Sequence, residues 1–423
     1  MGTIAGIRGT LATAGATSSA ISGAQSAAPV APSSASAAAD GSSDSIIERG
    51  KYLVEAGNCM SCHTRPGGAR FSGGRAFTTK FGTIYSSNIT PDVETGIGNW
   101  NVDDLRRAMH HGIAAGGYRL FPAFPYPSFT KVSDEDIVAV YAYLRTLQPV
   151  RYSPPANSFL FRQRWVMRFW NMLFFTPGRF EPDAKESKAW NRGAYLVEGL
   201  GHCGACHSPR NILMATIANR AYSGGRFQDR VAPGRIRRWS AVNLTSSKDG
   251  LAAWSMDNLA KYLKTGVCPR AGVFGPMDEV IDNSLKYLSA GDIRAMAVYL
   301  KSLRPQGSSV AALPPEAAMK SGAAIYHERC EECHMSSGRG GFLSAPPLQG
   351  SAVVQANDPA SLINIILYGP DTPKDIPLGP WETMEPYKGA LSDAEVAAVS
   401  DYVRESWNNR ADAVTPAEVA RQR

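Results

Sequence analysis

The sequence predicts an all-α protein made of three similar helical repeats in tandem, joined by long loops. The first support is internal repetition: RGKYLVEAGNCMSCH at residues 49–63 recurs as RGAYLVEGLGHCGACH at 192–207 and, more distantly, as SGAAIYHERCEECH at 321–334. The second support is that no run of alternating strands follows any copy. Each copy leads instead through a long loop to another helix.

Each repeat closes with the same kind of helix. The tetrapeptides SDED at 133–136, SAGD at 289–292 and SDAE at 392–395 are capping-box sequences, in which a serine and an acidic residue three positions later open a helix. An apolar stripe at helical spacing follows each box. These limits predict repeats at residues 46–150, 185–306 and 314–410.

Besides the short joint between the second and third repeats, three segments lie outside the repeats. Residues 1–45 are rich in Ala and Ser and poor in large apolar residues, so they predict a flexible leader, with a signal region as the export interpretation. Residues 151–184 form a linker and residues 411–423 a C-terminal tail. No stretch of 18 or more uncharged apolar residues occurs, so a spanning helix is not expected.

The linker contains the aromatic stretch NSFLFRQRWVMRFWNMLFF at 157–175, which predicts an amphipathic helix. One interpretation places this helix at a membrane interface, with Trp and Arg at the level of the headgroups. The other is a linker helix packed between the first two repeats or against a partner subunit. We favour the second because arginines interrupt each face, and peripheral membrane attachment then comes through the partner or another surface.

The charge balance is mildly basic, with a formal net charge of +7 and a pI near 9.0. Such a balance suits nucleic acid, an anionic membrane surface or an acidic protein partner. No nucleic-acid-binding motif accompanies it, so we expect no nucleic-acid partner. An evenly solvated surface is the simplest explanation of the charge.

Six of the seven cysteines lie in three copies of Cys-x-x-Cys-His. A zinc site needs four ligands, and each motif supplies one cysteine pair. A thioredoxin-like redox pair expects a βαβ setting, which the sequence does not show. Covalent c-type haem explains every residue of the motif, because two thiols one helical turn apart join the vinyl groups and the adjacent histidine ligates iron.

The motifs therefore predict three covalently bound haem c groups in three tandem class I cytochrome c domains. The expected haem-binding cysteines are Cys59, Cys62, Cys203, Cys206, Cys330 and Cys333, and the expected iron ligands are His63, His207 and His334. Covalent attachment of haem takes place outside the bacterial cytoplasm, so we expect an exported protein on the periplasmic side of the inner membrane. The seventh cysteine, Cys268, is expected as a buried small apolar residue.

A low-spin electron-transfer haem needs a sixth ligand, commonly methionine. Met277 and Met384 lie in proline-bearing loops shortly before the second and third closing helices, so we expect them to be these ligands. The first repeat has Phe124 at the corresponding place, within LFPAFPYPSF. Its haem is either five-coordinate or ligated by another residue, and Met109 is preferred to its neighbours His110 and His111. His202 and His327 are expected at the surface or at a haem edge.

Residues 46–410 resemble the triheme cytochrome c subunits of membrane-bound dehydrogenases of acetic acid bacteria and their relatives. The resemblance rests on five stretches: RGAYLVEGLGHCGACHSPRN, FGTIYSSNITPDVETGIGNW, PAFPYPSFTKVSDEDIVAVYAYL, GVFGPMDEVIDNSLKYLS and DPASLINIILYG. It implies a subunit that accepts electrons from a catalytic dehydrogenase subunit and passes them through three haems to membrane ubiquinone or a terminal oxidase.

The resemblance leaves the type of dehydrogenase open. Cytochromes of quinoprotein alcohol dehydrogenases resemble PAMPY at the first distal loop. The PAFPY of this chain is similar to cytochromes paired with molybdopterin-type aldehyde dehydrogenases, which also carry a small iron–sulfur subunit, and this partner is favoured. Flavin-dependent sugar dehydrogenases with similar cytochromes are a further alternative.

Two other classes of function compete with a dehydrogenase subunit. Phe124 makes a self-contained haem enzyme, such as a di-haem peroxidase with an open coordination site, a second hypothesis. A freely diffusing multihaem carrier with a basic docking surface is the third. No nucleophile–base pair and no Gly-rich nucleotide loop occurs in the sequence, so substrate chemistry is expected on another subunit.

Overall fold

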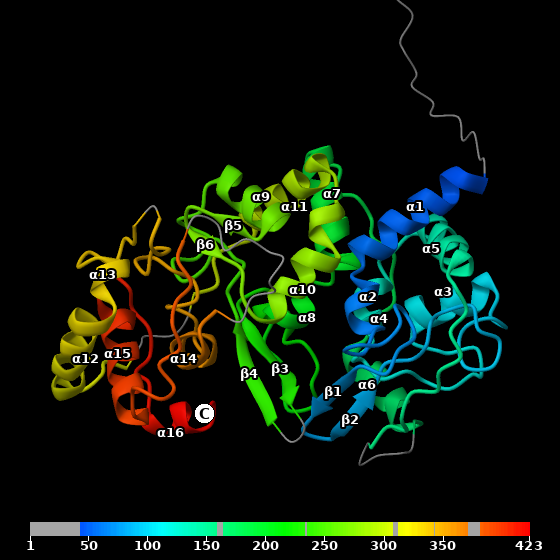
Figure 1. Cartoon of the computed structure of the whole chain (residues 1–423). Helices are drawn as coiled ribbons and strands as arrows, with labels where there is room; N and C mark the ends of the chain where they lie inside the picture. The colour runs from blue at the N-terminus through cyan, green and yellow to red at the C-terminus, as the bar shows by residue number, and fades with distance from the viewer. Residues whose placement is uncertain (1–42, 159–163, 233–234, 308–311, 342, 371–380) are drawn as a thin grey trace, which may run out of the picture. The chain divides into compact units, whose positions relative to one another are not determined.

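The structure is a computed structural model that describes residues 43–158, 164–232, 235–307, 312–341, 343–370 and 381–423 (Figure 1). Almost all of the expected leader and part of the linker, 159–163, lie outside the described residues. In the described part of the chain, no helix has the length and apolar character that crossing a bilayer requires.

In each repeat the opening helix crosses the closing helix. The pairs are α1 (Ser43–Ala56) with α5 (Asp134–Thr146), α7 (Lys188–Ala194) with α11 (Ala290–Ser302), and α12 (Glu316–Arg329) with α15 (Asp393–Glu405). Glycine makes each crossing possible, because a Cβ added at Gly50, Gly193 or Gly322 would lie 1.9, 2.0 or 2.1 Å from a carbonyl oxygen of the closing helix.

The closing helices begin where the capping boxes predict. Ser133, Ser289 and Ser392 are their N-cap residues, and each hydroxyl accepts a hydrogen bond from the amide three residues later. The third box alone is complete in both directions among these three helices.

Shorter helices connect each pair. The cysteine motifs lie on α2 (Cys59–Cys62), α8 (Gly204–His207) and α13 (Glu331–His334). A middle helix follows in each repeat: α3 (Val102–His111), α9 (Met256–Thr265) and α14 (Ala360–Tyr368). The remaining short elements are α4 (Tyr126–Phe129), η2 (Ala218–Arg220), α10 (Pro276–Asn283) and η3 (Leu285–Tyr287).

A π-helix, η1 (Tyr195–Leu200), continues α7 toward the second cysteine motif. The distance in sequence from Gly193 to Cys203 is one residue longer than that from Gly50 to Cys59. A π-helix accommodates one extra residue in a helix without breaking it. The insertion is therefore absorbed before the motif, and each of the two motifs lies on a short helix of four residues.

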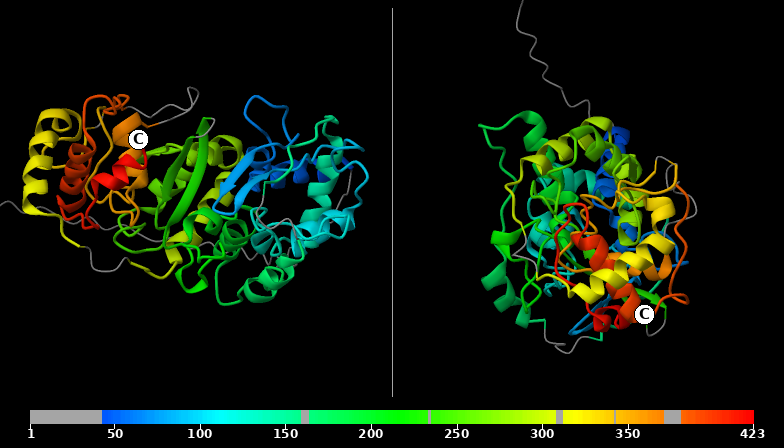
Figure 2. Two further views of the ribbon diagram at one scale, coloured as in Figure 1. Left: turned by 90° about the horizontal axis from the view of Figure 1, so that it is seen from below. Right: turned by 90° about the vertical axis from the view of Figure 1, so that its left-hand side faces the viewer.

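The helical class is confirmed, and hairpins correct the expectation of an all-α chain. The described residues contain three two-stranded antiparallel sheets. Their strands are β1 (Ala76–Thr79) with β2 (Gly82–Tyr85), β3 (Gly225–Ala232) with β4 (Arg235–Ala241), and β5 (Val267–Cys268) with β6 (Ala271–Gly272). In the β3–β4 hairpin Gly225 pairs with Ala241, and β3 contacts β1 while β4 contacts α14 (Figure 2).

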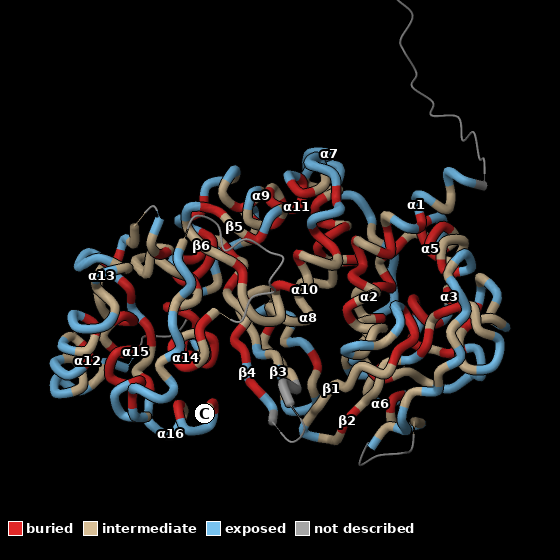
Figure 3. The backbone as a smooth tube through the Cα atoms, in the orientation of Figure 1, coloured by how far each residue is buried: buried red, intermediate tan, exposed pale blue. Residues whose placement is uncertain are grey.

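Most of the buried apolar residues fall into two clusters. Figure 3 marks the buried residues along the chain in red. A large cluster joins the first and second repeats, because Leu53 and Ile137 of the first pack in the same core as Leu196 and Leu300 of the second. A separate cluster belongs to the third repeat and includes Ile363. The first two repeats thus share their apolar burial, whereas the third has its own.

The segments outside the repeats also have structure. The described part of the linker contains α6 (Val166–Phe174), which buries Met167 and Asn171. The segment expected as a C-terminal tail contains α16 (Pro416–Ala420), which packs on α15 with Val419 fully buried. A capping box at Thr415 opens this last helix.

Candidate haem sites

The histidine of each cysteine motif is oriented by a backbone carbonyl. Nδ1 of His63 lies 2.7 Å from the oxygen of Ser87, and Nδ1 of His207 lies 2.7 Å from that of Val242. Nδ1 of His334 lies 3.2 Å from the oxygen of Pro346. A ring nitrogen that donates to a carbonyl fixes the tautomer, so Nε2 is left with a free lone pair. Metal-ligating histidines are oriented in this way.

Burial also prepares these histidines to act as ligands. It lowers the pKa of His63, His207 and His334 from the ordinary value, against the opposing effect of the carbonyl contact. A lowered pKa keeps the imidazole neutral at pH 7, and only the neutral ring ligates a metal.

The cysteines are not reactive thiolates. Burial raises the pKa of Cys59 and Cys203 to about 12, and that of Cys62 and Cys330 to about 11. Thiol–disulfide enzymes depend on a cysteine whose pKa is lowered, so this environment argues against a thioredoxin-like redox pair.

A cavity of about 570 Å³ opens beside the first and second motifs. Its lining includes Cys62 of the first motif and Cys206 of the second, together with His202. Pro122 and Pro125 of the first distal loop complete one side. The two motifs therefore face a common space, which Ala356, Asn357 and Asp358 of the third repeat also line.

These residues fit a covalent haem at each motif: two thiols on one turn, a neutral histidine with Nε2 free, and, for two of the three, an adjoining cavity. When bound, the haem iron supplies one-electron oxidation and reduction. The chain contributes the ligands, their orientation by the carbonyls of Ser87, Val242 and Pro346, and a buried setting that sets the reduction potential.

The structure corrects the predicted setting of one distal methionine, because Met277, expected in a loop, lies on a helix, whereas Met384 lies in a loop. Met277 is the second residue of α10 and packs against the large core cluster. Met384 packs against the core of the third repeat, although part of its loop, residues 371–380, lies outside the described residues. Each precedes the N-cap serine of its closing helix, as the sequence predicts.

The first repeat offers a methionine in a different element. Phe124 packs on the core and its ring lies 5.3 Å from that of Phe129. Met109 is buried in α3, in the same cluster that Cys59 and Phe124 contact. Gly112 ends α3 three residues after Met109, and Gly266 ends α9 three residues after Leu263. Met109 of the first repeat therefore occupies the position that Leu263 occupies in the second.

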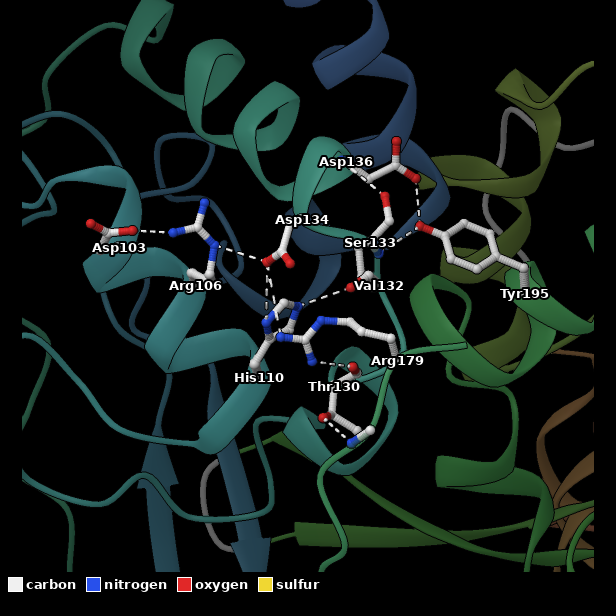
Figure 4. Close-up of polar contacts among 11 residues, drawn as sticks. Asp103, Arg106, His110, Thr130, Val132, Ser133, Asp134, Asp136, Arg179 and Tyr195 are labelled. Carbon is white, nitrogen blue, oxygen red and sulfur yellow. Dashed lines mark hydrogen bonds and ion pairs between the residues drawn. The ribbon is translucent and has the colours of Figure 1, made fainter. Parts of the chain in front are cut away.

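The neighbouring histidines have other surroundings. His110 is fully buried and its Nε2 lies 2.9 Å from the oxygen of Val132, while its Nδ1 faces Asp134 at 3.8 Å (Figure 4). His111 is exposed. The ring of His202 packs edge-on against Phe129 of the first repeat, and His327 is exposed and paired with Glu331. Cys268 is buried in β5, as expected.

Two arginines at equivalent positions were not recognised from the sequence as connecting residues. Arg75 and Arg226 occupy the same place in the repeated SGGR segments, which is the signal that could have found them. Arg75 donates to the oxygen of Ser61 at 2.8 Å and pairs with Glu279 of the second repeat. Arg226 pairs with Asp358 of the third. Each arginine reaches the repeat that follows its own.

The fold and these sites define a c-type cytochrome. The cytochrome c family model matches residues 47–148, and the model described as cytochrome C oxidase, cbb3-type, subunit III, matches residues 317–403. The chain belongs to the family of cytochrome c subunits of membrane-bound dehydrogenases such as those for alcohol and gluconate.

Three relatives support this assignment. The gluconate 2-dehydrogenase cytochrome c subunit of Pantoea cypripedii is 39% identical over 403 residues, covering 90% of each chain. The cytochrome c subunit of the quinone alcohol dehydrogenase of Gluconobacter oxydans is 36% identical, covering 88% of this chain and 80% of that one. A subunit of the nicotinate dehydrogenase of Pseudomonas putida is 41% identical over 86% of this chain, which spans 30% of that relative.

Proposed function

We propose that the chain is a triheme electron-transfer subunit, with three tandem class I cytochrome c domains. It takes electrons from a catalytic dehydrogenase subunit and delivers them to membrane ubiquinone. The observation that carries the proposal is the repeated anchoring of a motif histidine through Nδ1, at Ser87, Val242 and Pro346, which leaves Nε2 for iron each time. Membership of the dehydrogenase cytochrome family supports the direction of transfer.

The proposed sixth ligands are Met277 for the second haem and Met384 for the third. For the first haem we propose Met109, because His110 is held at Val132 and Phe124 has no ligand atom. Substrate chemistry stays on the catalytic subunit, so this chain has an oxidoreductase role only within the complex.

For the catalytic partner we propose a molybdopterin-type aldehyde dehydrogenase with a small iron–sulfur subunit, on the strength of PAFPY at 122–126. A quinoprotein alcohol dehydrogenase or a flavin-dependent sugar dehydrogenase is the alternative. The relatives named above serve alcohol, gluconate and nicotinate dehydrogenases, which supports a dehydrogenase partner of one of several types.

We propose a peripheral location on the periplasmic side of the inner membrane. The apolar face of α6 supports a surface attachment, because Phe169, Met172 and Leu173 are 56%, 74% and 63% exposed, beside Trp165. Leu213 is also exposed, and its backbone carbonyl accepts the indole hydrogen of Trp170 in α6. Apolar side chains gathered on one helix face suit either a lipid interface or a partner subunit.

Mass spectrometry and purification test the proposal together. The mature chain should carry the mass of three haem groups, and each Cys-x-x-Cys-His peptide should carry one. The chain should also co-purify with a catalytic dehydrogenase subunit from detergent-extracted membranes, and substrate added to that complex should reduce its haems. Isolation as a soluble cytochrome with no partner would refute the subunit role and favour a free carrier.

A self-contained haem enzyme is a second candidate, because Phe124 stands where the other repeats have a methionine. Carbon monoxide distinguishes the two. Rapid binding to one of three ferrous haems would show an open coordination site and favour the enzyme, whereas no binding favours electron transfer with Met109 as the ligand.

A further inference from the structure

The N-terminus of the closing helix is completed differently in the third repeat and in the first two. In the third, the Ser392 hydroxyl accepts from the amide of Glu395, and the Glu395 carboxylate accepts from the Ser392 amide at 2.7 Å. In the first two repeats the serine makes its half of the box, but the acidic side chain accepts hydrogen bonds from other donors.

The missing half in the first repeat comes from the second. Tyr195 of η1 donates its hydroxyl hydrogen to Oδ2 of Asp136 at 2.5 Å, and the same oxygen of Tyr195 accepts from the amide of Ser133 at 3.2 Å (Figure 4). The tyrosine thus takes the place that the N3 carboxylate holds in a complete capping box.

The missing half in the second repeat comes from the first, in the same way. Tyr52 of α1 donates to Oδ2 of Asp292 at 2.6 Å, and its hydroxyl oxygen accepts from the amide of Ser289 at 3.1 Å. The two repeats therefore exchange equivalent tyrosines, and each closes the helix of the other.

An arginine and the crossing glycine precede each tyrosine, by three and two residues. Arg49 donates to Asp136 at 2.5 Å and Arg192 to Asp292 at 2.7 Å, so each arginine secures the carboxylate of its own repeat. Counting from the crossing glycine, the third repeat has Ser321 in place of the arginine and Ala324 in place of the tyrosine. That repeat has no side chain for the exchange, and its capping box is complete without one.

Ion pairs also cross the interface between the first and second repeats, which we call the seam. Arg75 of the first repeat pairs with Glu279 of the second, and Lys131 of the first pairs with Glu198 of the second. Neither Arg75, 15% exposed, nor Glu198, 23% exposed, is a freely solvated charge. Their partners Glu279 and Lys131 are 42% and 36% exposed, so these pairs add contacts between the two repeats but little stability.

The exchanged tyrosines lie on the helices that lead into the cysteine motifs. Tyr52 precedes Cys59 by seven residues and Tyr195 precedes Cys203 by eight. The two motifs face a common cavity, which Cys62 and Cys206 both line. A shift of either helix along the seam would therefore change the distance between the two haem sites.

We propose that Tyr52 and Tyr195 are positioning residues for electron transfer between the first two haem sites. Their reciprocal hydrogen bonds join the first two repeats into one two-haem module, and the third repeat takes no part in this exchange. The inference rests on the proposed electron-transfer function. In the transfer itself, one electron leaves the ferrous site of one repeat and reduces the ferric site of the other.

Hydrogen exchange in the full-length holoprotein tests the reciprocal tyrosine hydrogen bonds between the first two repeats. In Tyr195→Phe the amide of Ser133 loses its acceptor, and in Tyr52→Phe the amide of Ser289 does. Each should exchange up to about tenfold faster, as expected for the loss of a hydrogen bond to a neutral hydroxyl. The effect thus appears in the repeat opposite the substitution. Tyr141→Phe is the matched control, because that hydroxyl donates to Trp100 within its own repeat.

Electron redistribution tests the positioning role. One electron is injected by light from a ruthenium complex, and freeze-quenched EPR follows it among the low-spin sites. Redistribution between the first two sites should slow about tenfold or more in the double variant, since transfer depends steeply on placement. The Tyr141→Phe control and the third site should be unchanged.

Three results would overturn the inference: unchanged exchange at Ser133 and Ser289, equal effects in the control, or faster exchange with normal redistribution. The last would mean that the tyrosines serve stability alone. Because light injects the electron, the test does not need the dehydrogenase. If electrons redistribute normally between the first two sites but no dehydrogenase reduces the chain, the proposed function is contradicted. The inference about Tyr52 and Tyr195 would still stand.

Discussion

Replacing Gly193 by alanine tests the helix crossing that organises each repeat. The added Cβ would lie 2.0 Å from the oxygen of Ala295, 2.5 Å from its carbonyl carbon and 2.9 Å from the Cβ of Tyr299. The first two atoms are backbone, so α7 and α11 must separate. Overpacking of this kind costs about 3 kcal/mol at the upper end of its usual range. Alanine regains about 1 kcal/mol of helix propensity, which leaves a net loss of about 2 kcal/mol.

The assay is denaturant unfolding of the holoprotein, followed by circular dichroism and by haem absorbance. Gly291→Ala in α11 is the matched control, because its new Cβ would meet only the Ser289 hydroxyl at 3.8 Å. The control should gain about 0.5 kcal/mol or more through the reduced flexibility of the unfolded chain. Equal unfolding free energies for Gly193→Ala and Gly291→Ala would refute the close crossing.

The remaining predictions concern the core, acid stability, the surface and a ligand. Arg404→Ala leaves three carbonyls without their donor, two of them in buried hydrogen bonds, and should cost about 3 kcal/mol in urea unfolding, whereas exposed Arg410→Ala should cost little. Burial raises the pKa of Asp292, but hydrogen bonds from its arginine and tyrosine partners outweigh this effect and hold the pKa below its ordinary value of 3.8. The stabilisation of the fold by this carboxylate is present above the ordinary value and is lost as the pH falls through the lowered pKa. Asp292→Asn should therefore make the free energy of unfolding less dependent on pH between about pH 5 and pH 3. Phe169→Ser should weaken flotation with anionic vesicles without changing the haem spectrum. Met384→Ala should create one carbon monoxide-binding haem, seen as a difference spectrum absent from the wild type.

The parts of the fold that the sequence predicted are those with local causes. Ser133, Ser289 and Ser392 cap their helices because a serine three residues before an acidic residue acts within a single turn. The cysteine motifs are equally local, since five consecutive residues hold both thiols and the histidine. What the pattern could not show was the destination of Asp136 and Asp292, which depends on a tyrosine from another repeat.

The β3–β4 hairpin was missed for a physical reason. Its strands carry charged residues in succession, as in Arg237 and Arg238, so no alternation of apolar and polar residues marks them. The outer edge of β4 is completed by α14: Ser361 exchanges hydrogen bonds with Ser240, and the Asn364 amide donates to the Arg238 oxygen at 2.6 Å. A strand whose edge is closed by a distant helix leaves no local signature.

The π-helix before the second motif is a case in which the signal was present. The spacing between the crossing glycine and the first cysteine is longer in the second repeat than in the first. A single π-turn can accommodate an extra residue inside an unbroken helix. The insertion matters for the seam because it falls at η1, the element that carries both Tyr195 and Glu198.

Repeated sequence does not produce repeated interfaces in this chain. Arg75 and Arg226 have the same local sequence and both reach the following repeat, yet one pairs with Glu279 beside a shared core and the other with Asp358 beside a strand edge. The first seam combines apolar burial with exchanged tyrosines, whereas the described contacts of the second include strand-edge hydrogen bonds such as that of Asn364. A substitution at the first seam should therefore disturb two haem sites together, because neither repeat completes its core or its closing helix alone.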